Sequence, residues 1–362
     1  MTSLLKKYRE YLPLSGVSEI SDLGEGGTPL VNSRFVQRSG NLFFKMEQLN
    51  PTGSFKDRFA AVEATLIKQA GMDAFLATSS GNTGSALAAY SARQDLRCLL
   101  FVNEHTPESK LNQMLAYGAE VFRVKDFGVT KELSEPIFER LQKLAEESGT
   151  RLVISAYKYS PEGMEGVKTI AYEIVEQLGK APDRVFVPVG GGGLLSAIWR
   201  GFLDLKKYGI IQTLPQISPV QPELNDTIVT QLDEHREQAK EVNTTTTISG
   251  LAVQVDIDAT LALESVRASG GKGYLVTDDE IRRVRDVLSS KEGIYVEPAG
   301  ATSVAGYLES VSRGDIEDKE NIVCILTGHG LKDTAPQGES GIFRASNIDI
   351  GGITAQLLEP VE

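Results

Sequence analysis

The chain has 362 residues, enough for two domains with separate hydrophobic cores. Hydrophobic residues make up 41% of it and charged residues 24%, a composition typical of a soluble globular protein. The formal net charge of −12 repels phosphodiester backbones, so no nucleic-acid partner is expected.

The first stretch of the chain is polar and mixed in charge. Residues 1–16 contain no long apolar run, so we expect neither a signal peptide nor a membrane anchor and predict a cytoplasmic protein. Cys98 and Cys324 both lie in apolar runs and should be buried thiols. The three histidines are scattered, so no metal site is expected.

Short apolar runs then alternate with amphipathic stretches, which is the pattern of parallel sheets covered by helices. The predicted strands are Leu42–Met46, Ala74–Ala77, Cys98–Val102, Glu120–Val124, Leu152–Ser155, Val185–Val189 and Ile322–Leu326. The predicted helices are Ser54–Lys68, Asn82–Arg93, Glu108–Tyr117, Lys131–Ser148, Glu165–Leu178, Leu194–Tyr208, Thr277–Lys291 and Gly300–Ser312. We expect surface loops over Ile211–Gly250, which is irregular and contains prolines and a threonine run.

A lysine stands where a turn meets the first long predicted helix. Residues 50–58 read Asn-Pro-Thr-Gly-Ser-Phe-Lys-Asp-Arg, in which Pro and Gly favour a turn and Ser54 is a suitable N-cap, with Asp57 three residues later. Lys56 would lie in the first helical turn, where the positive helix end destabilises its ammonium form. A neutral amine is what a Schiff-base nucleophile needs, so Lys56 is the candidate catalytic residue.

A second junction follows the strand predicted at Ala74–Ala77. Residues 79–84 read Ser-Ser-Gly-Asn-Thr-Gly and lead into a helix. Gly81 would let backbone N–H groups approach an anion, and a helix N-terminus favours negative charge. We therefore expect an anion-binding turn here, although an ordinary capped turn has the same composition.

Four consecutive glycines form the third junction. Gly190–Gly193 follow a predicted strand and precede a predicted helix, and only glycines let so many amides turn toward one phosphate. No Gly-Lys-Ser/Thr follows, so the loop is not a Walker A motif, and it lacks the third glycine of a dinucleotide fingerprint. The sequence predicts a phosphate-binding loop of another kind.

Thr327 and Gly328 follow the last predicted strand, within residues 325–333, which read Ile-Leu-Thr-Gly-His-Gly-Leu-Lys-Asp. In open α/β sheets, ligands bind beyond the carboxyl ends of the strands. Three predicted strands are followed in this way, at residues 79–84, 190–193 and 327–328, and together they indicate one composite site.

These motifs resemble those of threonine synthases, in the tryptophan-synthase-β (fold type II) family of pyridoxal-phosphate (PLP) enzymes. The lysine motif and residues 325–333 carry the resemblance, and so do residues 8–13 and the Gly-Glu-Gly-Gly-Thr-Pro-Leu stretch at 24–30. The likeness runs from about residue 8 to about residue 335.

The resemblance implies an α/β fold of two open parallel-sheet domains with the active site between them. A large PLP-binding domain would comprise residues 1–71 and 161–362. A small inserted α/β domain, residues 72–160, would close on the substrate. It also implies a homodimer.

The resemblance assigns roles to the motif residues. Lys56 would hold pyridoxal 5′-phosphate as a Schiff base, Asn82 would lie beside the cofactor's 3′-oxygen, and the Thr327 hydroxyl would meet its ring nitrogen. The implied cofactor-binding residues are Phe55, Lys56, Asn82, Gly190, Gly191, Gly192, Gly193, Leu194 and Thr327. The residues expected to bind the amino-acid substrate are Ser79, Ser80, Gly81, Thr83 and Lys158.

The sequence departs from the threonine synthase pattern on the substrate side. Gly163 stands where an arginine for the substrate phosphate is expected, and the glycine loop lacks the usual asparagines. Lys158 could replace the arginine, or it could be a plain surface lysine. The glycine loop and residues 247–253 instead resemble those of serine/threonine ammonia-lyases.

We therefore expect a PLP-dependent, threonine synthase-like enzyme that catalyses elimination or replacement at the β- or γ-carbon of a small, O-phosphorylated amino acid. Two alternatives stay open at this point: a serine/threonine ammonia-lyase, and a specialised β-replacement enzyme that uses phosphoserine. A non-catalytic PLP-binding protein is disfavoured by the intact Lys56.

Overall fold

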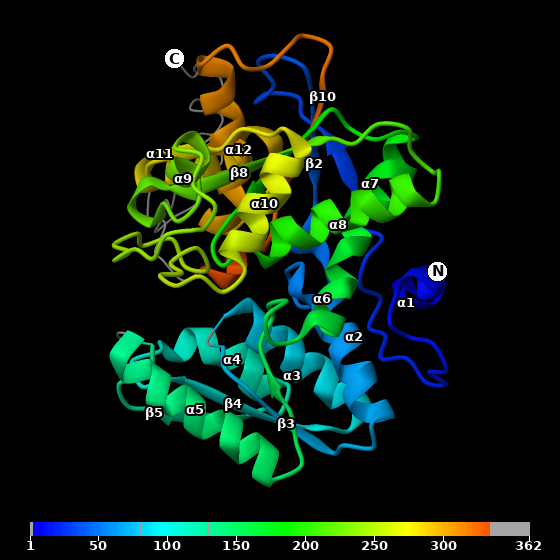
Figure 1. Cartoon of the computed structure of the whole chain (residues 1–362), viewed down its shortest axis with the longest axis vertical. Coiled ribbons are helices and arrows are strands. Elements are labelled where there is room, and N and C mark those ends of the chain that lie inside the picture. The colour runs from blue at the N-terminus through cyan, green and yellow to red at the C-terminus, as the bar shows by residue number, and fades with distance from the viewer. Residues whose placement is uncertain (1–2, 80, 129–130, 334–362) are drawn as a thin grey trace, which may run out of the picture.

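Two β-sheets organise the chain in the computed structural model, which describes residues 3–79, 81–128 and 131–333 (Figure 1). The six-stranded sheet has the order β1-β2-β10-β7-β8-β9, and the four-stranded sheet has the order β5-β4-β3-β6. All pairings in both sheets are parallel except that of β1 with β2. The predicted fold class, α/β with two parallel sheets, is confirmed.

The strands of the larger sheet come from both ends of the chain. They are β1 (Leu30–Asn32), β2 (Asn41–Lys45), β7 (Arg184–Pro188), β8 (Gln216–Pro222), β9 (Tyr274–Val276) and β10 (Asn321–Ile325). All five residues of β7 are buried, as expected for a parallel strand covered on both faces.

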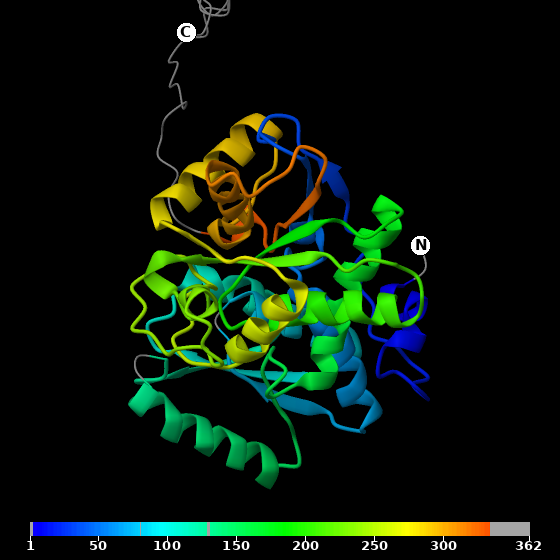
Figure 2. The ribbon, with the colours of Figure 1, turned by 45° about the horizontal axis from the view of Figure 1, so that its top comes forward.

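The smaller sheet is formed by one continuous stretch of the sequence. Its strands are β3 (Ala74–Ala77), β4 (Arg97–Asn103), β5 (Glu120–Val124) and β6 (Leu152–Val153). Helix α5 (Lys131–Glu147) covers the face of this sheet that is turned away from the larger sheet (Figure 2). The sequence predicts all four strands of this sheet, β6 as a longer strand ending at Ser155.

Helices fill the space around both sheets. The remaining α-helices are α1 (Leu4–Lys7), α2 (Lys56–Gln69), α3 (Asn82–Gln94), α4 (Glu108–Ala116), α6 (Pro161–Glu165), α7 (Thr169–Leu178), α8 (Gly193–Lys207), α9 (Val229–Asp233), α10 (Ala259–Ser269), α11 (Asp278–Val287) and α12 (Pro298–Ser312). Helix α2 packs against both α3 and α6, between the two sheets (Figure 1).

The prediction of surface loops over residues 211–250 is wrong in part. Strand β8 lies there as an inner strand between β7 and β9, and residues 217–222 are buried. The strand was not predicted because it contains prolines, and proline usually occurs at the edge of a sheet. Gln221 stabilises the turn that follows: its Oε1 accepts from the Ile228 N–H (2.9 Å) and its Nε2 donates to Thr227 Oγ1 (2.8 Å).

The helix predicted from Ser54 begins two residues later, at Lys56, with Phe55 as its N-cap residue, and Ser54 Oγ accepts from the Lys56 N–H (3.4 Å). Tertiary contacts hold the two preceding residues outside the helix: Ser54 bridges to Gly328, and the Phe55 N–H donates to the Thr327 carbonyl (3.1 Å). The Asp57 carboxylate instead closes the turn by accepting from the Thr52 N–H and hydroxyl (3.0 and 2.7 Å).

Candidate active site

The Lys56 amine contacts the turn that follows β6 of the smaller sheet. Its Nζ donates to Ser155 Oγ at 2.6 Å and lies 4.7 Å from the centre of the Phe55 ring. Burial lowers the pKa of the Lys56 ammonium to about 8, and the Asp258 carboxylate opposes this shift. The pKa is shifted in the direction that the sequence predicted, with burial as the main cause.

The N-terminus of α3 is linked to the same amine through Ser155. Thr83, in the first turn of α3, has its Oγ1 2.8 Å from Ser155 Oγ, so a chain of contacts runs from Lys56 through Ser155 to Thr83. The Gly81 N–H donates to Ser79 Oγ (3.3 Å) and tightens the turn before the helix. Ser80 lies outside the described residues.

The glycine loop wraps closely around the segment before α10. A β-carbon at Gly192 would lie 2.4 Å from the Asp258 carbonyl oxygen, and its φ of +95° also favours glycine. A β-carbon at Gly190 would lie 2.7 Å from the Gly250 carbonyl oxygen. The Asp258 N–H donates to the Gly191 carbonyl (3.0 Å). Gly190 and Gly192 are therefore required as glycines, and the loop ends at the N-terminus of the 15-residue helix α8, which favours an anion.

Asp258 joins the glycine loop to the turn that carries Ser155. Its carboxylate accepts from the backbone N–H groups of Tyr157 and Lys158 (2.7 and 3.1 Å), and a β-carbon at Gly193 would lie 2.8 Å from Asp258 Oδ2. Burial raises the pKa of this carboxyl. Asp258 thus fixes the position of the 155–158 turn relative to Lys56.

Asn82 and Gly328, the residue after Thr327, both contact Glu297. The Asn82 Nδ2 donates to Glu297 Oε1 (2.9 Å), and the Glu297 N–H donates to the Gly328 carbonyl (2.9 Å). Burial raises the pKa of Glu297 to about 7. Thr327 is buried two residues beyond the end of β10, and its carbonyl accepts from the Phe55 N–H.

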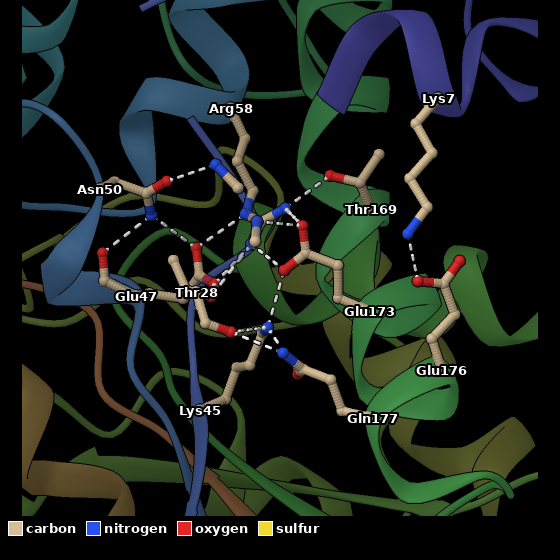
Figure 3. A network of polar contacts seen from close by, with 12 residues as sticks. Lys7, Thr28, Lys45, Glu47, Asn50, Arg58, Thr169, Glu173, Glu176 and Gln177 are labelled. Carbon is tan, nitrogen blue, oxygen red and sulfur yellow. Dashed lines mark hydrogen bonds and ion pairs between the residues drawn. The ribbon is translucent and has the colours of Figure 1, made fainter. Parts of the chain in front are cut away.

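A buried ionic network anchors the first turn of α2, where Arg58 follows Lys56 by two residues (Figure 3). The Arg58 guanidinium is inaccessible to solvent and bonds both carboxylate oxygens of Glu47 (2.7 and 2.8 Å) and both of Glu173 (2.8 and 3.0 Å). Lys45, also inaccessible, donates to Glu173 Oε2 (2.7 Å) and to the Thr28 carbonyl (2.7 Å). Two cations balance two anions, so the charges are neutralised inside the protein.

Lys158 and Gly163, the two positions considered for the substrate phosphate, have different surroundings. Lys158 is exposed, and its ammonium lies 5.5 Å from the centre of the Tyr159 ring. Gly163 is buried against α2: a β-carbon there would lie 2.4 Å from Glu63 Oε2 and 2.7 Å from the Phe59 ring. There is no room at position 163 for an arginine side chain.

Sequence reasoning missed Ser155 and Asp258 as site residues. Ser155 was predicted only as the end of a strand, and α10, which Asp258 precedes, was not predicted. A signal for α10 was present, since Asp258 and Gly270 are suitable residues at the two ends of a helix.

Two further features concern the described part of the chain. Among those residues, no helix has the length and apolar character needed to cross a membrane. No cluster of three His, Cys, Asp or Glu side chains that could hold a metal ion occurs within residues 3–79, 81–128 and 131–333.

Known proteins resemble this chain over most of its length. Residues 21–328 match the family described as pyridoxal-phosphate dependent enzyme. The threonine synthase of Methanocaldococcus jannaschii is 40% identical over 337 residues, covering 90% of this chain and 80% of that protein. The threonine synthase of Halalkalibacterium halodurans is 36% identical, covering 91% and 89%. Among solved structures, the serine racemase of Dictyostelium discoideum is similar, with a TM-score of 0.71, 26% identity, and coverage of 90% and 95%.

Proposed function

The chain belongs to the family of pyridoxal-phosphate dependent enzymes, and we propose that Lys56 is its cofactor lysine in a threonine synthase-like reaction on a small amino acid. The observation that carries the proposal is the Lys56 amine, whose pKa is lowered by burial and which donates to Ser155 Oγ. Such an amine can act both as a nucleophile and as a base near neutral pH.

The residues present fit the cofactor. A phosphate would lie against the tight turn of Gly190–Gly193, beside the N-terminus of α8 and Leu194. Asn82 would donate to the ring oxygen, Thr327 would meet the ring nitrogen, and Phe55 would pack near the aldehyde end. When bound, PLP delocalises the electron pair left on the substrate's Cα after proton removal.

The protein's own residues supply binding and proton transfer. Lys56, once its amine is free, takes the Cα proton as the general base. The substrate carboxylate would lie at the N-terminus of the 13-residue helix α3, against Ser79, Gly81 and Thr83, where N–H groups and the helix dipole favour an anion. Ser80 is proposed for the same role by its place in the sequence.

The surroundings of Gly163 and Lys158 bear on the leaving group. We propose an O-phosphorylated substrate because the similar threonine synthases cover nearly the whole chain. Gly163 leaves no room for an arginine, and the Lys158 ammonium would have to rotate away from Tyr159 to reach a phosphate. These two facts favour the second candidate function, a serine/threonine ammonia-lyase.

A substrate panel separates these reactions. The holoenzyme would be incubated with O-phosphohomoserine, O-phosphoserine, serine and threonine, and the products identified by mass spectrometry together with released phosphate. Phosphate release with formation of threonine supports the threonine synthase-like reaction. Keto acid from threonine, without turnover of the phosphorylated compounds, would identify an ammonia-lyase and refute the proposal.

Lys158→Ala tests the lysine that the sequence offers for the phosphate. If Lys158 binds it, the Michaelis constant for O-phosphohomoserine should rise roughly 10- to 100-fold, because a charge-assisted hydrogen bond of about 1.5–3 kcal/mol is lost. The Michaelis constant for threonine should stay the same. Equal Michaelis constants for the phosphorylated substrate in mutant and wild type would remove Lys158 from the site.

The resemblance also supports proposals about organisation. We propose a cytoplasmic homodimer, with residues 72–160 as a small domain that closes over the substrate and residues 1–71 and 161–362 as the large domain. Light scattering during size-exclusion chromatography measures the oligomeric state, and small-angle X-ray scattering with and without substrate measures closure.

A further inference from the structure

The amine of Lys56 must be held in place while it is free to act as a base. The Nζ of Lys56 donates a 2.6 Å hydrogen bond to Ser155 Oγ. Ser155 Oγ in turn lies 2.8 Å from Thr83 Oγ1. The three side chains come from three elements: the first residue of α2, the turn after β6 and the first turn of α3.

We propose that Ser155, supported by Thr83, is a positioning residue that holds the free amine of Lys56 toward the substrate. The inference rests on the proposed role of Lys56. A hydroxyl suits this task because it accepts from an ammonium and donates to a neutral amine. Thr83 makes the reversal possible, since its hydroxyl can be the donor or the acceptor toward Ser155.

Hydrogen bonds from backbone N–H groups stabilise the turn that carries Ser155. The Ile154 N–H donates to Ser160 Oγ (3.3 Å), and the Ala156 N–H donates to the Ile154 carbonyl (2.7 Å). Beyond Ala156, Asp258 holds two successive N–H groups of the turn. Asp258 is also the charged group that acts on Lys56, and it stabilises the ammonium form. Ser155 is therefore held in a defined place relative to the amine.

Removing the Ser155 hydroxyl should shift the titration of Lys56 in a known direction. A hydrogen bond to a charged group is stronger than one between neutral groups, so Ser155 stabilises the ammonium more than the amine. Ser155→Ala should therefore lower the pKa of Lys56 by about half a unit to one unit. Thr83→Val should lower it less, because it removes only the second hydroxyl.

The pKa can be measured without any turnover. Competitive labelling of lysines in the apoprotein by acetic anhydride from pH 6 to pH 10, read by mass spectrometry, gives the titration of Lys56. The rate at which the apoprotein captures added PLP, followed by absorbance, gives the nucleophilicity of the same amine. Ser155→Ala should slow capture up to about tenfold at pH 10, where the amine is neutral in both wild type and variant, because the amine is no longer oriented.

Matched variants separate positioning from a general structural effect. Ser155→Thr keeps the hydroxyl and should restore both readouts. Ser91→Ala removes a buried hydroxyl that bonds the Leu87 carbonyl within α3 (2.6 Å), and it should change neither. If Ser155→Ala does not fold, as judged by circular dichroism, Thr83→Val provides the test by the same two measurements.

The outcomes are distinct. A Lys56 pKa and a capture rate in Ser155→Ala equal to those of wild type overturn the inference. If wild-type Lys56 itself forms no borohydride-reducible link to PLP, the proposed function fails, whereas the labelling experiment still reports on the Ser155 contact. A lowered pKa in Ser155→Ala, with recovery in Ser155→Thr, supports it.

Discussion

Replacing Arg58 by methionine should destabilise the protein strongly, because the two buried carboxylates of Glu47 and Glu173 would lose their shared cation. Arg58 makes paired contacts of 2.7–3.0 Å with both carboxylates, and all three side chains are at most 5% exposed. Breaking such a buried pair costs about 3–5 kcal/mol. For 362 residues unfolding together, this corresponds to a fall in Tm of roughly 4–7 °C in calorimetry at pH 7.5.

The penalty should depend on pH in a defined direction. Arg58 and Lys45 overcome the effect of burial and hold the pKa of Glu173 at about 2, below its ordinary value. A carboxyl with a lowered pKa in the folded state stabilises the protein above its unfolded pKa, and this contribution is lost as the pH falls toward 2. The difference in Tm between wild type and Arg58→Met should therefore be smaller at pH 4 than at pH 7.5.

A matched control uses a solvent-exposed pair of the same kind. Arg97 contacts both oxygens of Glu120 (2.9 and 3.1 Å), and Arg97→Met should change Tm little at either pH, because water and salt screen the pair. A fall in Tm for Arg58→Met no larger than that of Arg97→Met, or equal falls at both pH values, would refute the reasoning.

Three further substitutions test the site. Gly163→Arg should lower Tm, because the side chain would overpack against Phe59 and Glu63 at a cost of about 1–3 kcal/mol or more. It should not improve the Michaelis constant for O-phosphohomoserine. A stable variant with a better Michaelis constant would contradict the packing argument. Thr327→Asp should protonate the cofactor's ring nitrogen more fully and increase racemised and transaminated products, measured by chiral chromatography; an unchanged product ratio would remove Thr327 from that nitrogen. Lys56→Ala should abolish turnover and the borohydride-reducible link to PLP; retention of both would refute the central proposal.

The places of the glycine motifs between strands and helices could be predicted from the sequence because turn formation is local. Gly190–Gly193 and Gly81 stand between a strand and a helix, and both the residue types and their order are written in consecutive positions. The lysine motif and the resemblance to threonine synthases identified the cofactor, and the family match over residues 21–328 confirmed it. Most strands of both sheets were found for the same reason, as short apolar runs between helical stretches.

Only the tertiary structure decided how these junctions come together. Ser155 and Asp258 gain their importance from Lys56, about 100 and 200 positions away in the sequence, and nothing in their own neighbourhoods indicates that contact. Strand β8 was missed because burial on both faces outweighs its prolines. The start of α2 moved from Ser54 to Lys56 because Gly328 and Thr327 hold the preceding backbone. Sequence thus determined the cofactor chemistry, which depends on residue type and local turns, while long-range packing decided which side chains surround the reactive amine.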